Sequence, residues 1–282
     1  MKLNKKLFFR IIISVLFLVF LFIIVKPAEI ISTINQAKLN WVLLVFLFLP
    51  VNLLFQFFRW QYLVKNCVAF YDNKEILKSI FYSFSYSIFT PARLGDIGRA
   101  FHITHTKKQE LVAFAVYEKL FAFISLFFMG TLALSVHKHP LFLVCSAVSI
   151  VLLSYSHKIA NFIPKLKDHT KKLNRIRPLK LFAISILFIF IYVIQFYFAL
   201  RAFHPIDLIP SFFLIILVIF FNSIPIALSG LGVREILSIY FFKNIGIAAP
   251  QAASAALLIF FIYILIPTFI GFILHLLPIK NK

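Results

Sequence analysis

The sequence predicts an all-α polytopic membrane protein with six full transmembrane helices and two oppositely oriented re-entrant helical hairpins, about eight hydrophobic segments in all. Composition is the first reason. Of the 282 residues, 62% are hydrophobic and 38 are phenylalanine, which leaves too little polar surface for a soluble domain. The second reason is the recurrence of apolar stretches of about 20 residues, the length that crosses a bilayer. The third is the distribution of positive charge between these stretches. We expect one integral membrane domain over residues 1–282.

The first full span is expected at about 7–25. Three basic residues, Lys2, Lys5 and Lys6, precede it and a fourth, Arg10, lies in its first turn, as in a signal peptide. No small-x-small cleavage pattern follows, and the apolar run ends at Lys26-Pro27. We therefore predict an uncleaved first helix. The following segment, about 28–40, indicates a polar or surface helix outside the membrane.

Five further apolar stretches predict the remaining full spans. Trp41 and Trp60 flank the second span, as aromatic side chains do at a membrane interface. Arg59, beside Trp60, is expected to anchor the headgroup layer, and a contribution to a lipid path is the alternative. Pro50 and Pro267 fall inside spans, which neighbouring helices tolerate in lipid. The predicted spans lie at about 41–58, 111–136, 140–156, 179–200 and 251–277.

Two regions, about 75–108 and 208–249, are apolar but interrupted by Pro, Gly and charge. Positive charge indicates how they meet the membrane. With the N-terminus inside and both regions re-entrant, 20 Lys and Arg lie inside and 5 outside, whereas one crossing by each region puts 12 inside and 16 outside. The positive-inside rule favours re-entrant regions and cytoplasmic termini in the inner membrane. A basic loop at about 157–180 is then cytoplasmic, where it attracts anionic lipid or serves only as a topology determinant.

The two re-entrant regions would enter from opposite sides, as in an inverted-repeat transporter with its site near the bilayer midplane. Their tips resemble each other. Each has a proline, closely spaced glycines and an arginine eight or nine residues after the proline. For the second tip, a short extramembrane loop is the alternative. The tip residues are Pro91, Gly95 and Gly98 in the first region and Pro225, Ser229, Gly230 and Gly232 in the second.

Charged side chains at these tips predict an anion site. A helix that begins inside the membrane presents free N–H groups and the positive end of its dipole, and arginine forks hold a phosphate bidentately. We expect carboxylates to hold the arginines, or to compete with a lipid phosphate for them. The alternative is that the charges pair only with one another and lock the helices together. The candidate phosphate-binding residues are Arg93, Arg99, Lys119 and Arg234, and the supporting carboxylates are Asp96, Glu118 and Glu235.

Motifs for other chemistries are weak. His102-x-x-His105 and His137-x-His139 have no nearby Cys or carboxylate ligands, so we interpret them as interfacial histidines and expect no metal. The sequence has no nucleotide-binding, zinc-protease or serine-hydrolase motif, and no cofactor is expected. Because the basic residues border apolar spans, the expected partners are the bilayer and an anionic phospholipid or lipid-linked substrate, not nucleic acid.

Four motifs occur together in this chain: Phe58-Arg59-Trp60, Pro91-x-Arg93-x-Gly95-Asp96-x-x-Arg99, Glu118-Lys119 and Ser229-Gly230-Leu231-Gly232-Val233-Arg234-Glu235. Together they resemble the transmembrane region of lysylphosphatidylglycerol synthase/flippase proteins. The resemblance covers nearly the whole chain and is most specific at the last motif. Two positions depart from the family pattern. Ala92 replaces a frequent Gly, and Lys119 replaces the usual Arg, so that this position offers a point charge in place of a fork.

The resemblance implies lipid handling, typically movement of a phospholipid across the membrane. Larger family proteins carry a soluble aminoacyltransferase domain after this region. We expect this chain to resemble the small stand-alone members, and we do not expect aminoacylation by it alone. The first hypothesis is therefore a lipid translocase or flippase with an anionic headgroup at a midplane site.

Two other hypotheses remain open. The second is an enzyme such as a membrane glycosyltransferase or another lipid-modifying transferase, in which Asp96, Glu118 or Glu235 would act as acid or base. The third is an accessory subunit of a lipid synthase, docked through the basic loop. A homodimer is also open.

Overall fold

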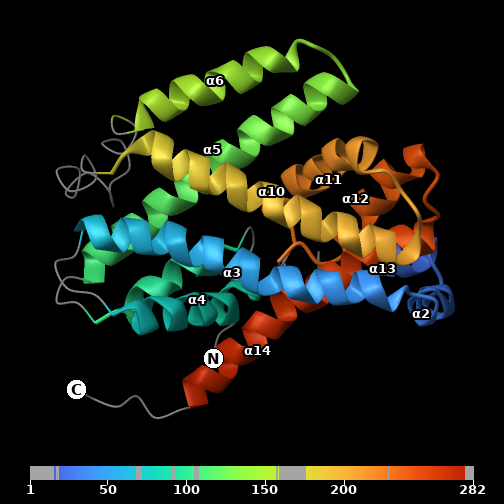
Figure 1. Cartoon of the computed structure of the whole chain (residues 1–282), viewed down its shortest axis with the longest axis horizontal. Coiled ribbons are helices and arrows are strands. Elements are labelled where there is room, and N and C mark those ends of the chain that lie inside the picture. Colours follow the sequence, from blue (N-terminus) through green and yellow to red (C-terminus); the bar gives the residue numbers. More distant parts are fainter. Residues whose placement is uncertain are drawn as a thin grey trace. The chain divides into compact units, whose positions relative to one another are not determined.

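The computed structural model describes residues 16, 19–67, 72–90, 93–104, 108–156, 158, 176–227 and 229–276, and every regular element in these ranges is helical (Figure 1). The all-α prediction is therefore confirmed for the described residues. In chain order the elements are α2 (Pro27–Asn35), α3 (Leu39–Cys67), α4 (Asn73–Ser87), the 3₁₀ helix η1 (Leu94–His102), α5 (Lys108–His137), α6 (Phe142–Ser154), α10 (Pro178–Phe203), α11 (Leu208–Asn222), α12 (Val233–Phe242), η2 (Lys243–Ile245), α13 (Ala249–Phe260), the π-helical turn η3 (Phe261–Leu265) and α14 (Ile266–Leu276).

Four helices in the described part of the chain are long and apolar enough to cross a membrane. They coincide with four of the six predicted spans. The span predicted at 140–156 corresponds to α6, which has only 13 residues, and the span predicted at 7–25 lies mostly outside the described residues. The count of six spans therefore stays a prediction. The four long helices are Leu39–Asn66, Lys108–His137, Pro178–Arg201 and Ala249–Leu276.

The two interrupted regions do break where their Pro and Gly residues predicted. In the first region α4 ends at Ser87, and η1 begins seven residues later at Leu94. In the second region α11 ends at Asn222 and α12 begins at Val233. Neither region is one continuous helix. Their re-entry into a membrane stays a prediction, as does the position of the basic loop, most of which lies outside the described residues.

The chain divides into two compact units, each assembled from separate stretches of sequence. Unit 1 consists of Met1–Pro50, Ile88–Leu94 and Ile191–Leu265, and unit 2 of Val51–Ser87, Gly95–Phe190 and Ile266–Lys282. The division falls within α3, within α10, after the first residue of η1 and between η3 and α14, so α3, α10 and η1 contribute residues to both units.

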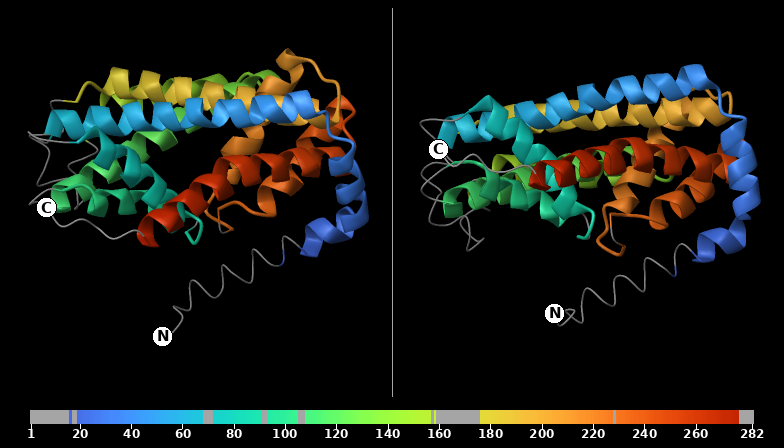
Figure 2. Two further views of the ribbon diagram at one scale, coloured as in Figure 1. Left: turned by 60° about the horizontal axis from the view of Figure 1, so that its bottom comes forward. Right: turned by 90° about the horizontal axis from the view of Figure 1, so that it is seen from below.

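Unit 1 has an apolar helical core. In it α12 packs against α11 and α13, and α2 packs against α13. Consecutive residues 214–218 of α11 are all buried, as expected for a helix enclosed on every side. The Phe221 and Phe241 rings stack with their centroids 5.8 Å apart, and Gln195 Nε2 donates to the Val45 carbonyl at 2.9 Å. Figure 2 shows that α2 runs across the direction of α3.

Unit 2 holds two close helix pairs, α5 with α6 and α4 with α14. Gly271 lets α14 approach α4 closely, because a Cβ at this position would lie 2.2 Å from the Phe81 carbonyl oxygen. Thr131 and Ser146 share a hydrogen bond of 2.9 Å between α5 and α6, which lie side by side in Figure 1. Polar groups are thus satisfied inside the helix pairs.

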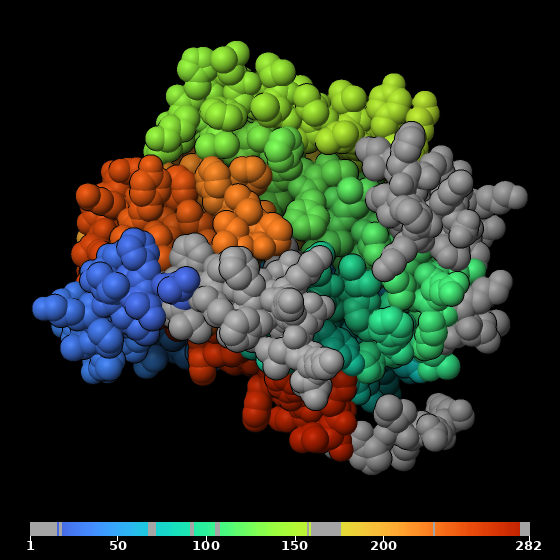
Figure 3. Space-filling view, turned by 180° about the vertical axis from the view of Figure 1, so that it is seen from behind, coloured from blue at the N-terminus to red at the C-terminus, as the bar shows by residue number. Residues whose placement is uncertain are grey.

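One side of α6 is open to the outside (Figure 3), and its exposed residues are mostly apolar. Val144, Val148 and Val151 follow one another at helical spacing and are 62%, 47% and 54% exposed. A soluble domain rarely leaves such a continuous apolar stripe uncovered. This surface is suited to contact with lipid.

Candidate functional site

Glycines determine how the first tip turns. A Cβ on Gly95 would lie 2.5 Å from the backbone carbonyl of Tyr86, and a Cβ on Gly98 would lie 2.7 Å from the Tyr86 ring. Only residues without a Cβ let η1 fold back so tightly against the last turn of α4. Because side chains three residues apart eclipse one another in a 3₁₀ helix, Asp96 and Arg99 then share one side of η1.

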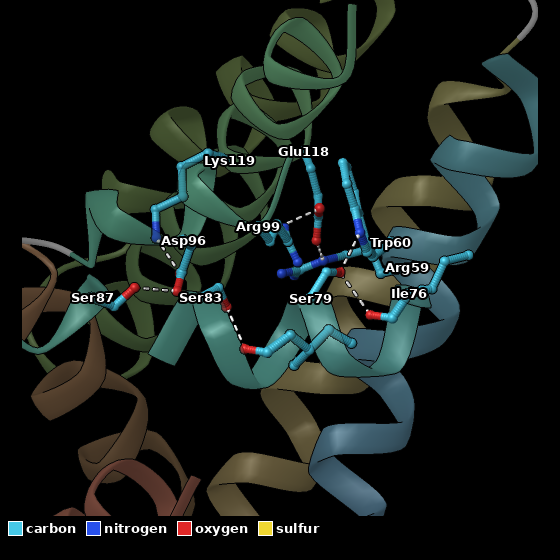
Figure 4. A network of polar contacts seen from close by, with 11 residues as sticks. Arg59, Trp60, Ile76, Ser79, Ser83, Ser87, Asp96, Arg99, Glu118 and Lys119 are labelled. Atoms are coloured by element: carbon cyan, nitrogen blue, oxygen red, sulfur yellow. Dashed lines mark hydrogen bonds and ion pairs between the residues drawn. The ribbon is translucent and has the colours of Figure 1, made fainter. Parts of the chain in front are cut away.

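Arg59, Arg99 and Glu118 form the first charged cluster, which we call the Glu118 cluster (Figure 4). Arg59 Nε donates to Glu118 Oε1 at 2.6 Å, and Arg99 Nη2 donates to Glu118 Oε2. Their side chains are 10%, 4% and 0% exposed for Arg59, Arg99 and Glu118, respectively. Since two guanidiniums share one carboxylate, the cluster carries one net positive charge.

Aromatic rings support both arginines of this cluster. The Arg99 guanidinium lies 4.6 Å from the centre of the Trp60 ring, and that of Arg59 lies 5.3 Å from the centre of the Phe188 ring. Trp60 is itself fixed by a 3.1 Å hydrogen bond from its Nε1 to Ser79 Oγ. The ring faces attract the cations, so the guanidiniums have supports other than Glu118. Within the described residues, Arg99 Nε is buried and has no hydrogen-bond partner.

Asp96 and Lys119 form a second ion pair in unit 2. Lys119 Nζ lies 3.1 Å from Asp96 Oδ2, and Ser87 Oγ donates to Asp96 Oδ1 at 2.6 Å. The side chains are 17% and 18% exposed for Lys119 and Asp96, more than those of the Glu118 cluster. Figure 4 shows this pair beside η1, where Asp96 connects the end of α4 to α5. The pair is neutral.

The second tip is a tight turn in unit 1. Ser229, Gly230 and Gly232 have φ angles of 48°, 74° and 82°, a conformation in which glycine carries little strain. A Cβ on Gly230 would lie 2.3 Å from Asn222 Oδ1 at the end of α11. Ser229 Oγ donates to the carbonyl of Ile88 at 3.2 Å, so the second tip is bonded to the residues that follow α4.

Arg234 and Glu235, here the Glu235 pair, occupy the first turn of α12. Glu235 Oε2 accepts from the Gly232 backbone N–H at 2.6 Å, and Oε1 accepts from Arg234 Nη2 at 2.8 Å. Both side chains are buried, at 2% and 0% exposure. A carboxylate in this position caps the helix and complements its dipole. The pair is neutral, and it lies among the rings of Phe260, 5.1 Å from the Arg234 guanidinium, and Tyr192.

The predicted site residues thus fall into separate groups. Arg99, Glu118, Asp96 and Lys119 belong to unit 2. Arg234 and Glu235 belong to unit 1, together with Arg93, whose guanidinium lies 5.5 Å from the centre of the Tyr263 ring. Pro225 is exposed at the second turn, and Pro91 lies outside the described residues. The carboxylate that holds Arg99 is Glu118, while Asp96 is bonded to Lys119 and Ser87.

Arg59 has a larger place in the site than its sequence context suggested. A usable signal was present in α3. Asn52, Gln56 and Arg59 recur at intervals of four and three residues, so they share one helical face, and all three are buried. Polar residues along one side of an otherwise apolar span mark a protein-facing or wet surface.

His102 lies in a set of aromatic contacts, whereas His105 lies outside the described residues and His139 Nδ1 accepts from the Leu141 backbone N–H. The His102 ring stacks on Tyr82 with centroids 3.8 Å apart, and its Nε2 lies 2.8 Å from the Tyr86 hydroxyl. Among the described residues, no three His, Cys, Asp or Glu side chains gather as a metal site requires.

Nearly the whole chain matches a known membrane-protein family. A sequence profile described as the lysylphosphatidylglycerol synthase TM region matches residues 7–271. No curated protein matches the chain.

Proposed function

The chain belongs to the lysylphosphatidylglycerol synthase TM-region family, and from that premise we propose that it is a lipid translocase that binds an anionic phospholipid headgroup at buried arginines. It is a multi-pass membrane protein of a family connected with phospholipid synthesis and flipping. The proposal goes further, to a headgroup site and a transport step. In this proposal Arg99 in unit 2 and Arg234 in unit 1 each contact a lipid phosphate, with Lys119 adding positive charge in unit 2 and Arg93 in unit 1.

One observation carries the proposal, namely the net positive charge of the Glu118 cluster. An ionised side chain inside a membrane is costly unless it is compensated, and here two buried arginines share a single buried carboxylate. An internal pair of one cation and one anion would be neutral, whereas this cluster has one cation in excess, and an additional anion would compensate it. The phosphate of a lipid is the anion most available at that depth, and an arginine fork suits it.

Helix lengths support a re-entrant arrangement. α4 and α11 have 15 residues each, or ~22 Å of helix, whereas the hydrocarbon core is ~30 Å thick. We therefore place the regions at about 75–108 and 208–249 as hairpins that enter the inner membrane from opposite sides, with the chain termini in the cytoplasm.

The test is headgroup translocation in proteoliposomes. Arg99→Ala and Arg234→Ala should each reduce the flipping of a fluorescent phosphatidylglycerol by at least about tenfold, the effect of losing ~1.4 kcal/mol of headgroup binding. Arg177→Ala is the matched control, because the Arg177 side chain is exposed and the same substitution there should leave flipping unchanged.

Equal flipping by wild type and both variants, at equal reconstituted amounts, would refute the assignment. A purified chain that transfers a labelled sugar from a donor to lipid would instead favour the transferase. The flipping assay and the sugar-transfer assay use the same wild-type and variant proteins, so one set of proteoliposomes serves both.

A further inference from the structure

We propose that Glu118 is an internal counter-ion that takes the place of a phosphate between Arg59 and Arg99, and that a monoanionic phosphodiester headgroup exchanges with it. The inference rests on the proposed function and deepens it, since it adds Arg59 to the site and defines the class of headgroup. It concerns unit 2 alone.

The geometry around Glu118 is that of a bound oxyanion. Each carboxylate oxygen accepts from a different guanidinium, one from Arg59 on α3 and the other from Arg99 on η1. Phosphate oxygens accept from arginine forks in the same manner. Glu118 is fully buried, so the two arginines are already positioned for an anion when no lipid is bound.

Within the described residues, the Glu118 carboxylate accepts no hydrogen bond from the backbone. Its two oxygens bond to side chains only. The arginines keep other supports when it moves, because Arg99 lies against Trp60 and Arg59 against Phe188. Exchange of Glu118 for another anion therefore leaves the binding groups in place.

Polar side chains surround the cluster on two helices. Ser79, Ser83 and Ser87 recur every four residues on α4 and are buried, and Figure 4 shows them along the side of α4 that carries the charged network. On α3, Gln56 lies one turn before Arg59 and is also buried. A headgroup that reaches the arginines thus meets hydroxyl and amide groups, which substitute for water.

Charge arithmetic selects the ligand class. The Glu118 cluster carries one net positive charge, and the neighbouring Asp96–Lys119 pair carries none. When a phosphodiester displaces Glu118 from one of the two guanidiniums, Glu118 stays ionised beside the other, so the single negative charge that the headgroup adds neutralises the cluster. A phosphomonoester with two negative charges leaves an excess anion, and an uncharged headgroup leaves the excess cation. Arg99 Nε, a buried donor that lacks a hydrogen-bond partner within the described residues, is available to the incoming phosphate.

Tryptophan fluorescence reports on this cluster directly. The chain has two tryptophans, Trp41 and Trp60, so Trp41→Phe leaves Trp60, in contact with Arg99, as the only one. The full chain in nanodiscs of uncharged lipid is titrated with phosphatidylglycerol, phosphatidic acid, diacylglycerol, glycerophosphoglycerol or inorganic phosphate. We expect a saturable change in Trp60 emission with phosphatidylglycerol, with an apparent Kd at least tenfold lower than for phosphatidic acid, and no change with diacylglycerol.

The soluble probes separate lipid from free phosphate. Phosphate or glycerophosphoglycerol that binds as tightly as phosphatidylglycerol overturns the assignment to a lipid headgroup. Equal affinity for phosphatidic acid and phosphatidylglycerol overturns the charge argument.

Glu118→Gln separates an exchangeable counter-ion from a structural lock. The substitution preserves shape and removes the competing charge, so phosphatidylglycerol affinity should rise about tenfold and release should slow, which lowers the flipping rate. Arg59→Gln should weaken binding about tenfold. Unchanged or weaker binding by a folded Glu118→Gln variant overturns the proposal. If this variant does not fold, the comparison of phosphatidylglycerol with phosphatidic acid on the Glu118 protein still decides. If the wild-type protein flips lipid but Glu118→Gln does not bind phosphatidylglycerol more tightly, the counter-ion proposal is refuted and the translocase proposal stands. If Glu118→Gln binds more tightly but the wild-type protein flips no lipid, the translocase proposal is refuted.

Discussion

Glu118 and Glu235 are both fully buried carboxylates beside arginines, yet they use their oxygens differently. Glu118 accepts from Arg59 and Arg99, which lie 59 and 19 residues away along the chain. Glu235 accepts from the Gly232 backbone, three residues before it, and from its immediate neighbour Arg234. The first carboxylate joins three elements of unit 2, while the second completes a single helical turn of unit 1.

This difference indicates that the Glu235 carboxylate is fixed by its role in capping α12, whereas the Glu118 carboxylate can be exchanged for another anion. Removal of Glu235 from its place uncaps α12, because the Gly232 N–H loses its acceptor. Removal of Glu118 breaks no backbone hydrogen bond of the described residues, and it leaves two arginines held by aromatic rings. The Glu235 pair is neutral and the Glu118 cluster is positive, so an external anion is more strongly attracted to the Glu118 cluster.

The largest expected effect is that of Glu118→Ala. Two arginines are then left buried without a counter-charge, which should lower the free energy of unfolding by about 3–5 kcal/mol. Glu235→Ala leaves one arginine and one uncapped N–H, with an expected loss of about 2–4 kcal/mol. Thermal unfolding in nanodiscs measures both. Added phosphatidylglycerol should raise the Tm of Glu118→Ala by more than that of Glu235→Ala, because only the first variant leaves two arginines without a counter-charge that the lipid phosphate can supply; equal rescue of the two variants would remove the distinction between the carboxylates.

The glycines at the two tips give the next effect. In Gly95→Ala the new Cβ meets the Tyr86 backbone, which cannot turn aside, so η1 must shift, at a cost of about 1–3 kcal/mol. In Gly230→Ala the Cβ meets the end of the flexible Asn222 side chain, and the main cost is the positive φ, about 1–2 kcal/mol. Gly246→Ala is the control, with a similar φ of 78° and open space around it.

The functional readout separates these variants further. A shift of η1 displaces Arg99, so Gly95→Ala should lower phosphatidylglycerol affinity as well as Tm. Gly246→Ala should lower only Tm. If Gly95→Ala binds lipid as wild type does, the tight turn does not position the arginine.

The apolar stretches and the tip residues were sufficient to predict the helical architecture and its two breaks. The prolines and glycines between Ile88 and Gly98 and between Pro225 and Gly232 interrupt runs that are otherwise helical, and the interruptions occur there. Length was harder to predict than existence. The stretch at 140–156 is mainly apolar, with four serines, yet α6 covers only the 13 residues Phe142–Ser154, because hydropathy does not mark where a helix starts and stops.

Pairing could not be derived from the sequence. Energetics required that Glu118 have a partner, and the sequence offered Arg99 or Arg234; that Arg99 is one partner and Arg59 the other depends on how α3, η1 and α5 pack. The 3₁₀ geometry of η1, which puts Asp96 and Arg99 on one side, follows from the close approach of Gly95 to Tyr86. That approach is a tertiary contact and has no local signature.

The smallest expected effect concerns the Asp96–Lys119 pair, and it sharpens the contrast with the buried carboxylates. Its side chains are about a sixth exposed, so solvent screens the attraction between Asp96 and Lys119. The attraction between the buried Glu118 and its arginines is not screened in this way. A double-mutant cycle of Asp96→Asn and Lys119→Met should give a coupling energy of about 0.5–1 kcal/mol from thermal unfolding. Because Asp96 neutralises Lys119 locally, Lys119→Met should change phosphatidylglycerol affinity by less than about fivefold. The matching cycle of Glu118→Gln and Arg99→Gln gives the coupling energy of the buried pair. If the Asp96–Lys119 coupling energy is as large, burial does not rank these ion pairs, and the positive charge of the site extends to Lys119.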